Sequence, residues 1–289
     1  MLLEQSFFMN IRRLIVIGMC VMALGVHAQR ARELTPALLL SSGQYELKLF
    51  HNLYTQTYWY DEQGRKAFTG ERSTFFTTIG EWRTGWKARW NIGLMAFFRS
   101  VRYDLPDSSP FSVLALTNEG TMARTALTHM GATVRWLPFS NSRYTSVKAS
   151  LLLPLARNLQ GPPYLEHDGF HLWLQWLYDR QLAYHWQLYA EAGLWARIDR
   201  RWRASNSYAV VPLKAFLSWL PNDHFIAYVF AEWSSVPTEL LGNYYVQTGA
   251  GLKWYPVGHF ELELMSSAFV AGAKNGAGYT LNLGWRLVW

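Results

Sequence analysis

The last eleven residues of the chain, 279–289, alternate between two kinds of side chain. Apolar or aromatic residues stand at every second position: Tyr279, Leu281, Leu283, Trp285, Leu287 and Trp289. Thr280, Asn282, Gly284 and Arg286 stand between them. A period of two predicts an extended strand with two unlike faces. Because one face is wholly apolar and has aromatic residues at both ends, the pattern is typical of a strand whose outer face meets lipid.

Four residues of this strand follow the spacing polar, x, Gly, x, x, apolar, x, aromatic. They are Asn282, Gly284, Leu287 and Trp289. This spacing resembles the C-terminal assembly signal of bacterial outer-membrane β-barrels. The resemblance implies that barrel-assembly machinery recognises this end of the chain during biogenesis.

The first 28 residues have the features of a secretory signal peptide. Arg12 and Arg13 precede an apolar run at 14–24, and residues 26–28 offer small side chains for cleavage. The run is shorter than the ~20 residues of a spanning helix, and an uncleaved signal anchor is the alternative. Both Met1 and Met9 are possible starts. The single cysteine, Cys20, lies in this segment, so the mature chain would form no disulfide bond. We predict export to the bacterial outer membrane through a cleaved signal.

The composition agrees with a chain that spreads its hydrophobic residues along strands. Half of the residues are hydrophobic and 16% are aromatic, yet no apolar run after residue 28 is long enough for a membrane helix. Loss of residues 1–28 lowers the formal net charge from +7 to +6. The remaining basic residues alternate singly with aromatic ones, which argues against nucleic-acid binding. We expect no cofactor and no metal.

Twelve strand-like segments follow one another from residue 43 onward, after a short segment at 29–42 that we place in the periplasm. The clearest cover residues 86–99, 184–199 and 244–255. They are about 11–15 residues long, whereas globular strands have about 5–6 and a tilted membrane strand needs about 9–11. This length favours a barrel in the membrane over a soluble sandwich.

The connections alternate in length. The predicted short connections are 84–85, 138–142, 179–182, 221–223 and 256–258; the long ones are 57–72, 103–122, 156–168, 200–207, 235–242 and 271–278. Residues 43–289 are therefore predicted to form an all-β, antiparallel transmembrane β-barrel of about 12 strands, with short periplasmic turns and longer extracellular loops. The alternative is a short extra hairpin within 103–122, which would raise the count by two strands.

The parity of each strand also predicts which side chains face the lumen. The charged candidates are Glu46, Lys48, Lys87, Arg89, Lys148, Asp179, Glu191, Arg197, Lys214, Glu232, Lys253, Glu261, Glu263 and Arg286. Five aromatic residues are predicted to narrow the lumen: Phe97, Trp173, Tyr189, Trp195 and Tyr228. Glycines on the same face either make room for large inward side chains or are merely tolerated. A barrel of about 12 strands is intermediate between filled eight-stranded barrels and open porins, so a wide diffusion porin is disfavoured.

Three stretches carry a resemblance to a known group of proteins: Gly-Gln-Tyr-Glu-Leu-Lys-Leu-Phe at 43–50, Ser-Pro-Phe-Ser-Val at 109–113, and Ala-Lys-Asn-Gly-Ala-Gly-Tyr at 273–279. With its layout, the chain resembles the small outer-membrane barrels of Gram-negative bacteria grouped as outer-membrane transporters, including the phenol-degradation-pathway-like set. The resemblance implies the barrel architecture and a transport role, and it carries over no site residue.

Two local clusters could carry chemistry. Residues 166–171 contain His167 and His171, which would lie about 13 Å apart in an extended strand, too far to share one ion unless the loop bends. Arg200, Arg201 and Arg203 follow a strand at the predicted outer rim. They could contact lipopolysaccharide phosphates, or they could only keep the rim soluble.

These observations leave three functional hypotheses. The first is a narrow channel or transporter for a small solute of unknown identity. The second is a plugged structural or assembly barrel that binds a partner through its loops, which a continuous salt-bridged network in the lumen would favour. The third is a membrane-embedded hydrolase, but no mature histidine has a serine two residues later, the spacing of the known outer-membrane phospholipases.

Overall fold

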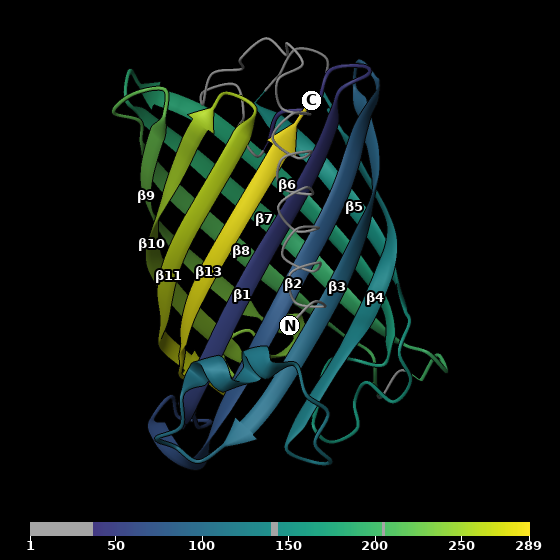
Figure 1. Ribbon diagram of the computed structural model, residues 1–289, viewed down its shortest axis with the longest axis vertical. Coiled ribbons are helices and arrows are strands. Elements are labelled where there is room, and N and C mark those ends of the chain that lie inside the picture. Colours follow the sequence, from purple (N-terminus) through teal and green to yellow (C-terminus); the bar gives the residue numbers. More distant parts are fainter. Residues whose placement is uncertain (1–36, 140–143, 204–205) are drawn as a thin grey trace, which may run out of the picture.

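The computed structural model describes residues 37–139, 144–203 and 206–289. They form a β-barrel whose strands are tilted around a common axis (Figure 1). The twelve long strands are β1 (Tyr45–Tyr60), β2 (Lys66–Lys87), β3 (Trp90–Asp104), β4 (Ala123–Trp136), β5 (Thr145–Pro154), β6 (Gly169–Ala183), β7 (Trp186–Asp199), β8 (Tyr208–Trp219), β9 (Phe225–Ser235), β10 (Tyr244–Val257), β11 (Phe260–Ala273) and β13 (Tyr279–Val288). The connections contain the two-residue strand β12 (Asn275–Gly276) and the 3-10 helices η2 (Pro110–Ala115) and η4 (Pro237–Glu239). The predicted all-β fold is confirmed.

The sheet closes between its first and last strands. All neighbouring long strands are antiparallel, and β1 pairs with both β2 and β13. The β1–β13 seam runs from the pair Glu46 and Val288 to the pair Thr55 and Tyr279. Because the ring of long strands is closed, it presents no open backbone edge to lipid.

The two faces of the barrel wall differ in polarity, as the alternation in the terminal strand predicts. On β13, the side chains of Asn282 and Arg286 are buried, whereas Tyr279, Leu281 and Leu283 are exposed. Buried polar residues and exposed large apolar residues are the inverse of a soluble protein, and they suit a wall with lipid outside and a polar lumen inside. No helix among the described residues is long and apolar enough to span a bilayer.

An aromatic belt surrounds one end of the barrel. Tyr45 stacks on both Trp82 and Trp289, with ring centroids 6.1 and 5.9 Å apart. Trp90 and Trp136 stack at 5.7 Å on the neighbouring strands β3 and β4. Exposed aromatic rings also stand on β7 to β10 near this end: Trp186, Trp219, Phe225 and Trp254. Such belts lie at the interface between lipid and water.

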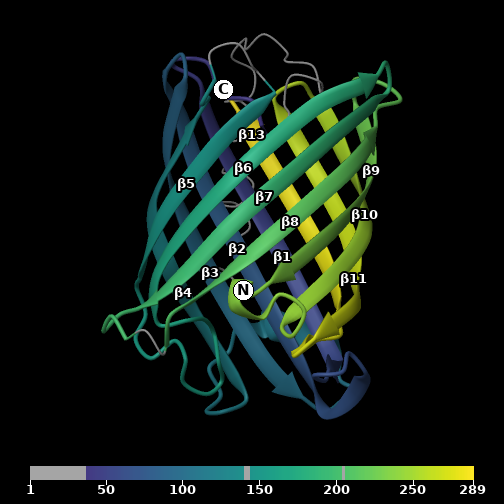
Figure 2. The ribbon, with the colours of Figure 1, turned by 180° about the vertical axis from the view of Figure 1, so that it is seen from behind.

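The two ends of the barrel carry different connections, and we call them the turn side and the loop side. The C-terminus lies at the turn side, and the longer connections, including η2, gather at the loop side (Figure 1). Figure 2 shows the wall formed by β4 to β10 from behind. The predicted long connection at 103–122 contains η2 and one isolated bridge between Glu119 and Ala123, rather than an extra hairpin.

Three predicted connections are wrong in position. The pair Thr84 and Gly85 lies inside β2, and the chain reverses at 88–89. Residues 179–182 lie inside β6, and the turn is at 184–185. The predicted loop 57–72 is reduced to 61–65, because Asp61 Oδ1 accepts hydrogen bonds from the amides of Gln63 and Arg65 and tightens the reversal. The strands β1 and β2 consequently extend further than the sequence predicts.

Candidate functional site

A cavity of about 390 Å³ lies inside the barrel, and strands from all around the ring line it. Its lining contains seven acidic and seven basic residues, so it is formally neutral. The acidic residues are Glu46, Glu81, Asp179, Glu191, Glu232, Glu261 and Glu263, and the basic ones are Lys48, Arg83, Arg135, Lys148, Lys214, Lys253 and Arg286. This central cavity is the candidate site.

Three residues that we predicted to face the lumen do not line the central cavity. Lys87 and Arg89 are exposed at the β2–β3 turn, where the Lys87 ammonium lies 4.6 Å from the Trp86 ring centroid. Arg197 lies in the loop-side end of the lumen, beside Glu166. The assignment of Lys87 and Arg89 to the lumen is wrong because the predicted strand at 86–99 begins four residues before β3 does.

Three further residues line the cavity and were not among those predicted to face the lumen: Glu81, Arg83 and Arg135. Glu81 and Arg83 flank the outward-facing Trp82, so alternation could have identified both. The misplaced turn at 84–85 removed this end of β2 from the predicted strand. Arg135 alternates in the same way with the aromatic residue Trp136 at the end of β4.

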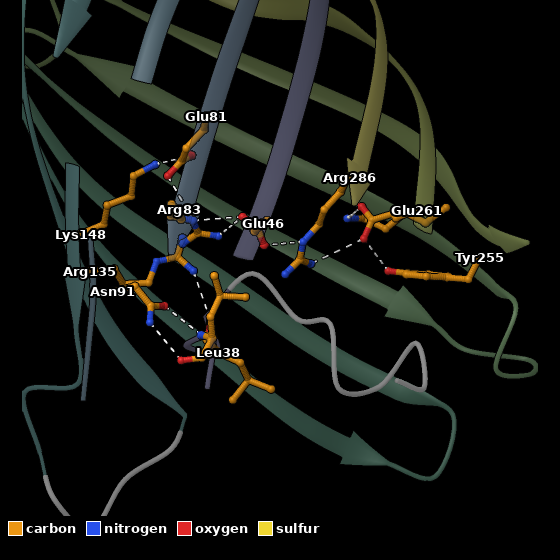
Figure 3. Close-up of polar contacts among 12 residues, drawn as sticks. Leu38, Glu46, Glu81, Arg83, Asn91, Arg135, Lys148, Tyr255, Glu261 and Arg286 are labelled. Atoms are coloured by element: carbon orange, nitrogen blue, oxygen red, sulfur yellow. Dashed lines mark hydrogen bonds and ion pairs between the residues drawn. The ribbon is translucent and has the colours of Figure 1, made fainter. Parts of the chain in front are cut away.

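An ion-pair chain occupies the turn-side half of the lumen (Figure 3). It begins with Lys148 on β5, whose ammonium lies 2.8 Å from Glu81 on β2. Arg83 pairs with both Glu81, at 3.3 Å, and Glu46 on β1. Because Lys148 and Glu81 stand on non-adjacent strands, the ion-pair chain crosses part of the lumen at this point.

The ion-pair chain continues across the seam of the barrel. Arg286 on β13 lies 2.6 Å from Glu46 and 3.7 Å from Glu261 on β11. Lys253 on β10 then pairs with Glu261 at 2.8 Å and with Glu263 at 3.5 Å. Buried charges are tolerated when each has such partners, so the chain fixes side chains from six strands in one arrangement.

The opposite part of the cavity carries fewer charges, and uncharged donors form hydrogen bonds with its carboxylates. On β7, the Glu191 carboxylate accepts hydrogen bonds from Gln175 Nε2 at 2.9 Å and from the Tyr189 hydroxyl at 3.1 Å. Lys214 on β8 pairs with Glu232 on β9 at 3.5 Å.

Aromatic rings cover the wall beside these groups. The Phe216 and Phe230 rings stack with centroids 5.1 Å apart, and Tyr228 lies 5.7 Å from Phe216. A Cβ atom at Gly249 would lie 2.6 Å from the Phe230 ring, and one at Gly251 would lie 2.4 Å from Tyr228. Glycine at these two positions therefore makes room for large inward side chains, the first of the two roles considered from the sequence.

A short N-terminal segment, residues 37–42, lies across the turn side of the lumen. The Leu40 amide donates to Asn91 Oδ1 at 2.8 Å, and Asn91 Nδ2 donates to the Leu40 carbonyl at 3.0 Å. Arg135 donates to the Leu38 carbonyl at 3.4 Å. The Leu40 side chain packs in an apolar cluster with four residues from the turn-side ends of other strands and turns, namely Leu220, Ile226, Tyr255 and Val288.

Gly85 allows the N-terminal segment to approach β2 closely. A Cβ atom at residue 85 would lie 1.9 Å from the Ser41 carbonyl oxygen, which no side chain can tolerate without displacement. The Gly43 amide also donates to the Gly85 carbonyl at 3.0 Å. The N-terminal segment, part of the predicted periplasmic region 29–42, therefore covers the turn-side mouth. The predicted signal peptide, residues 1–28, lies outside the described residues.

The loop 155–168 fills the other end of the lumen around a buried carboxylate. Glu166 is 2% exposed and lies 2.6 Å from Arg99 on β3 and 3.7 Å from Arg197 on β7. Burial raises the pKa of the Glu166 carboxyl, but Arg99 and Arg197 together outweigh burial and hold that pKa well below its usual range. Leu159 and Leu165 pack beside this group against Val101.

Histidine rings stack behind Glu166. The loop bends, so the His167 and His171 ring centroids are 6.1 Å apart instead of the distance expected for an extended strand. The His129 and His171 rings stack at 4.0 Å. Across residues 37–139, 144–203 and 206–289, no group of three or more potential ligands is arranged to hold a metal ion.

The remaining predicted contact residues lie near the loop side and at the C-terminal strand. Arg200 pairs with Asp168 at 2.9 Å and Arg203 with Asp199 at 3.5 Å, while Arg201 is exposed. In the C-terminal strand, Asn282 and Gly284 face inward and Leu287 and Trp289 face outward. The indole of Trp289 belongs to the aromatic belt, and its backbone exchanges hydrogen bonds of 2.8 and 3.0 Å with Tyr45.

Two solved structures share this architecture at low sequence identity. An outer-membrane channel from Pseudomonas putida F1 matches with a TM-score of 0.66 and 11% identity, over 88% of this chain and 98% of that one. The β domain of the Bordetella autotransporter BrkA matches with a TM-score of 0.55 and 15% identity, over 85% of this chain and 99% of that one. No protein-family model and no curated protein sequence matches the chain. The comparisons therefore establish the outer-membrane barrel fold.

Proposed function

We propose that this barrel is an outer-membrane channel for small solutes, held in a closed state by its N-terminal segment. The observation that carries the proposal is the central cavity, a charged and polar space inside a wall whose outer surface is apolar. A barrel of this size has room for a narrow passage, and charged side chains along a passage set its selectivity. The solved Pseudomonas putida channel supports a channel role for the same fold.

Passage requires the N-terminal segment to leave the turn-side mouth. The substitution Gly85→Ala places a methyl group against the Ser41 carbonyl and should displace the segment. The matched control is Gly80→Ala on the same strand, because its new Cβ would meet only the end of the Leu49 side chain, at 3.2 Å. Single-channel recordings of the chain from Gln29 in planar bilayers should show longer or larger openings for Gly85→Ala, whereas Gly80→Ala should match the unsubstituted protein.

A closed scaffold is the second candidate, and the ion-pair chain favours it. Charges that face water need no partners, whereas those of the ion-pair chain are matched one to another. This candidate would replace the channel if a correctly folded barrel remained silent in bilayers even with Gly85→Ala. The protein would then act through its loops on a partner.

We place the protein in the bacterial outer membrane, with the loop side facing outward. Arg200, Arg201 and Arg203 would then contact the phosphates of lipopolysaccharide. Replacing all three with glutamine should weaken binding to lipopolysaccharide micelles, whereas Arg89→Gln at the turn side should not. Equal binding by all variants would remove this role.

The C-terminal residues Asn282, Gly284, Leu287 and Trp289 remain our proposed signal for the barrel-assembly machinery. Trp289→Ala should slow insertion of the chain into membranes that contain this machinery. The control is Trp254→Ala, which removes an exposed tryptophan of the same aromatic belt from an internal strand. An equal delay in both variants would assign the effect to the belt.

A further inference from the structure

The central cavity distributes its charges unevenly around the barrel. The four consecutive strands β6 to β9 contribute Asp179, Glu191, Glu232 and Lys214, which sum to a formal charge of −2. The other strands contribute four acidic and six basic residues, which sum to +2. We call these parts the acidic wall and the basic wall. The lumen is neutral as a whole, yet an electric field runs across it from the basic wall to the acidic wall.

One charge on each wall makes no direct ion pair. Lys48 on β1 and Glu191 on β7 both line the cavity, and among the described residues neither lies within ion-pair distance of an opposite charge; their electrostatic neighbours, Glu261 and Lys214, act from further away. Six strand positions separate β1 from β7 in the closed order of twelve, so the two side chains start from opposite sides of the lumen. The charges of the ion-pair chain, in contrast, already contact one another.

The acidic wall also contains an unsatisfied acceptor. Gln175 is 7% exposed and donates through Nε2 to Glu191, but its Oε1 accepts no hydrogen bond from the described residues. A buried acceptor without a donor is unfavourable. A cationic group bound beside Glu191 and Gln175 could supply the missing donor.

Apolar surface completes the cavity between the two charges. Phe216 and Phe230 stack on the acidic wall, and Phe50 stands next to Lys48 on the inner face of β1. The volume of about 390 Å³ is near the lower end of the range for ligand pockets, ~300–1,000 Å³. The cavity therefore combines separated opposite charges with an aromatic surface in a space suited to one small molecule.

We infer that the central cavity binds a small zwitterionic solute with an apolar side group, its carboxylate toward Lys48 and its ammonium toward Glu191. The inference rests on the proposed channel, since such a solute would be the one that the channel selects. A molecule without charged groups would gain little from the field across the lumen. A singly charged molecule would use one wall only.

Four probes with the same phenyl group and short linker test this. They are phenylalanine, 3-phenylpropionate without the ammonium, phenethylamine without the carboxylate, and the uncharged 3-phenylpropanamide. Equilibrium dialysis against the folded full chain, with a detergent blank, measures their binding without requiring transport. Phenylalanine should bind about tenfold more tightly than each singly charged probe, which lacks one of the two charged contacts, and about a hundredfold more tightly than 3-phenylpropanamide, which lacks both.

Two substitutions separate the contributions of the walls. Lys48→Gln should weaken the binding of phenylalanine and of 3-phenylpropionate about tenfold and leave the binding of phenethylamine unchanged. Glu191→Gln should weaken the binding of phenylalanine and of phenethylamine and leave the binding of 3-phenylpropionate unchanged. Lys66→Gln, which makes the same change at an exposed site outside the cavity, should affect no probe. Each variant is first shown to retain the heat-modifiable mobility of a folded barrel.

The inference is overturned if the four probes bind equally, if a singly charged probe binds most tightly, or if Lys48→Gln weakens all probes alike. Dialysis is repeated with Asn91→Ala, which loosens the N-terminal segment in the full chain and so gives the probes access to the cavity. If no probe binds to this variant, the inference is also overturned. If the barrel conducts but shows no preference for phenylalanine, the proposed channel stands and the proposed solute class is rejected. If it prefers phenylalanine but never conducts, the solute class stands and the channel is rejected.

Discussion

The turn side of the barrel is closed by six residues of the N-terminal segment, whereas the loop side is filled by fourteen residues around a buried carboxylate. The N-terminal segment is held by two neutral hydrogen bonds with Asn91, by one long hydrogen bond from the Arg135 guanidinium and by one apolar cluster. The loop is held by Glu166 between two guanidinium groups from different strands. Removing one partner of a buried ion pair costs more than removing a neutral hydrogen bond. If the barrel is the channel proposed above, we therefore expect the loop to stay in place and the N-terminal segment to be the part that opens.

The largest effect is expected from Glu166→Gln. This change leaves the Arg99 and Arg197 guanidinium groups without their carboxylate, so it should lower the free energy of unfolding. We expect a loss of about 3 kcal/mol, the lower end of the range for a broken buried ion pair, because both arginines retain some contact with solvent. Chemical denaturation in detergent measures it, with the exposed Glu119→Gln as control. A loss below about 1 kcal/mol would mean that the loop is no firmer than the N-terminal segment.

The same carboxylate predicts a pH dependence. The pKa of Glu166 is lowered in the folded state, so its stabilisation is present above the ordinary carboxyl pKa of 4.5 and is lost as the pH falls toward the folded-state value. The difference in unfolding free energy between the unsubstituted protein and Glu166→Gln should stay constant from about pH 7 to about pH 5 and shrink below 4.5. A difference that grows on acidification would contradict the lowered pKa.

A smaller effect is expected at the turn side. Asn91→Ala removes both hydrogen bonds to Leu40, which should cost the closed state about 1–2 kcal/mol and raise the open probability in bilayers about tenfold. Its effect on the unfolding free energy should be less than that of Glu166→Gln. Asn118→Ala, in an exposed loop-side turn, is the matched control and should leave gating unchanged. If Asn91→Ala lowered global stability more than Glu166→Gln, the roles of the two ends would be exchanged.

The smallest effect tests whether burial, and not position in the loop, makes Glu166 important. Arg200 pairs with Asp168 of the same loop, but their side chains are 39% and 27% exposed. Because exposed ion pairs contribute about 0–1 kcal/mol, Arg200→Gln should lower the unfolding free energy by less than ~1 kcal/mol. A loss equal to that of Glu166→Gln would show that the loop tolerates no change.

The barrel fold could be predicted from the sequence, because alternation with a period of two shows which side chains lie on each face of a strand. Tyr279, Leu281 and Leu283 are exposed as the alternation predicts, and most of the predicted lumen charges line the cavity. The error at 84–85 came from a glycine. Gly85 was interpreted as a turn residue, whereas its role is to let the Ser41 backbone approach, which depends on a segment more than 40 residues away.

Neither closure could be predicted, because alternation assigns a side chain to a face and does not name its partner across the lumen. Lys148 meets Glu81 and Glu166 meets Arg99 only because the strand number, tilt and register bring β5 to β2 and the loop to β3. The stacked histidines depend in the same way on a bend in the loop that the spacing of His167 and His171 does not reveal.

The seam between β1 and β13 has a consequence for how quickly this chain reaches its native state. Glu46 and Arg286 are separated by 240 residues, so their contact must await synthesis of almost the whole chain. Bringing two such distant points together costs on the order of 5 kcal/mol in chain entropy, and this cost precedes the stabilisation that the contact provides. Contacts of this range make folding slow, and until they form, two strand edges remain unpaired. We therefore expect the joining of the first strand to the last to be a slow step in the formation of the closed barrel.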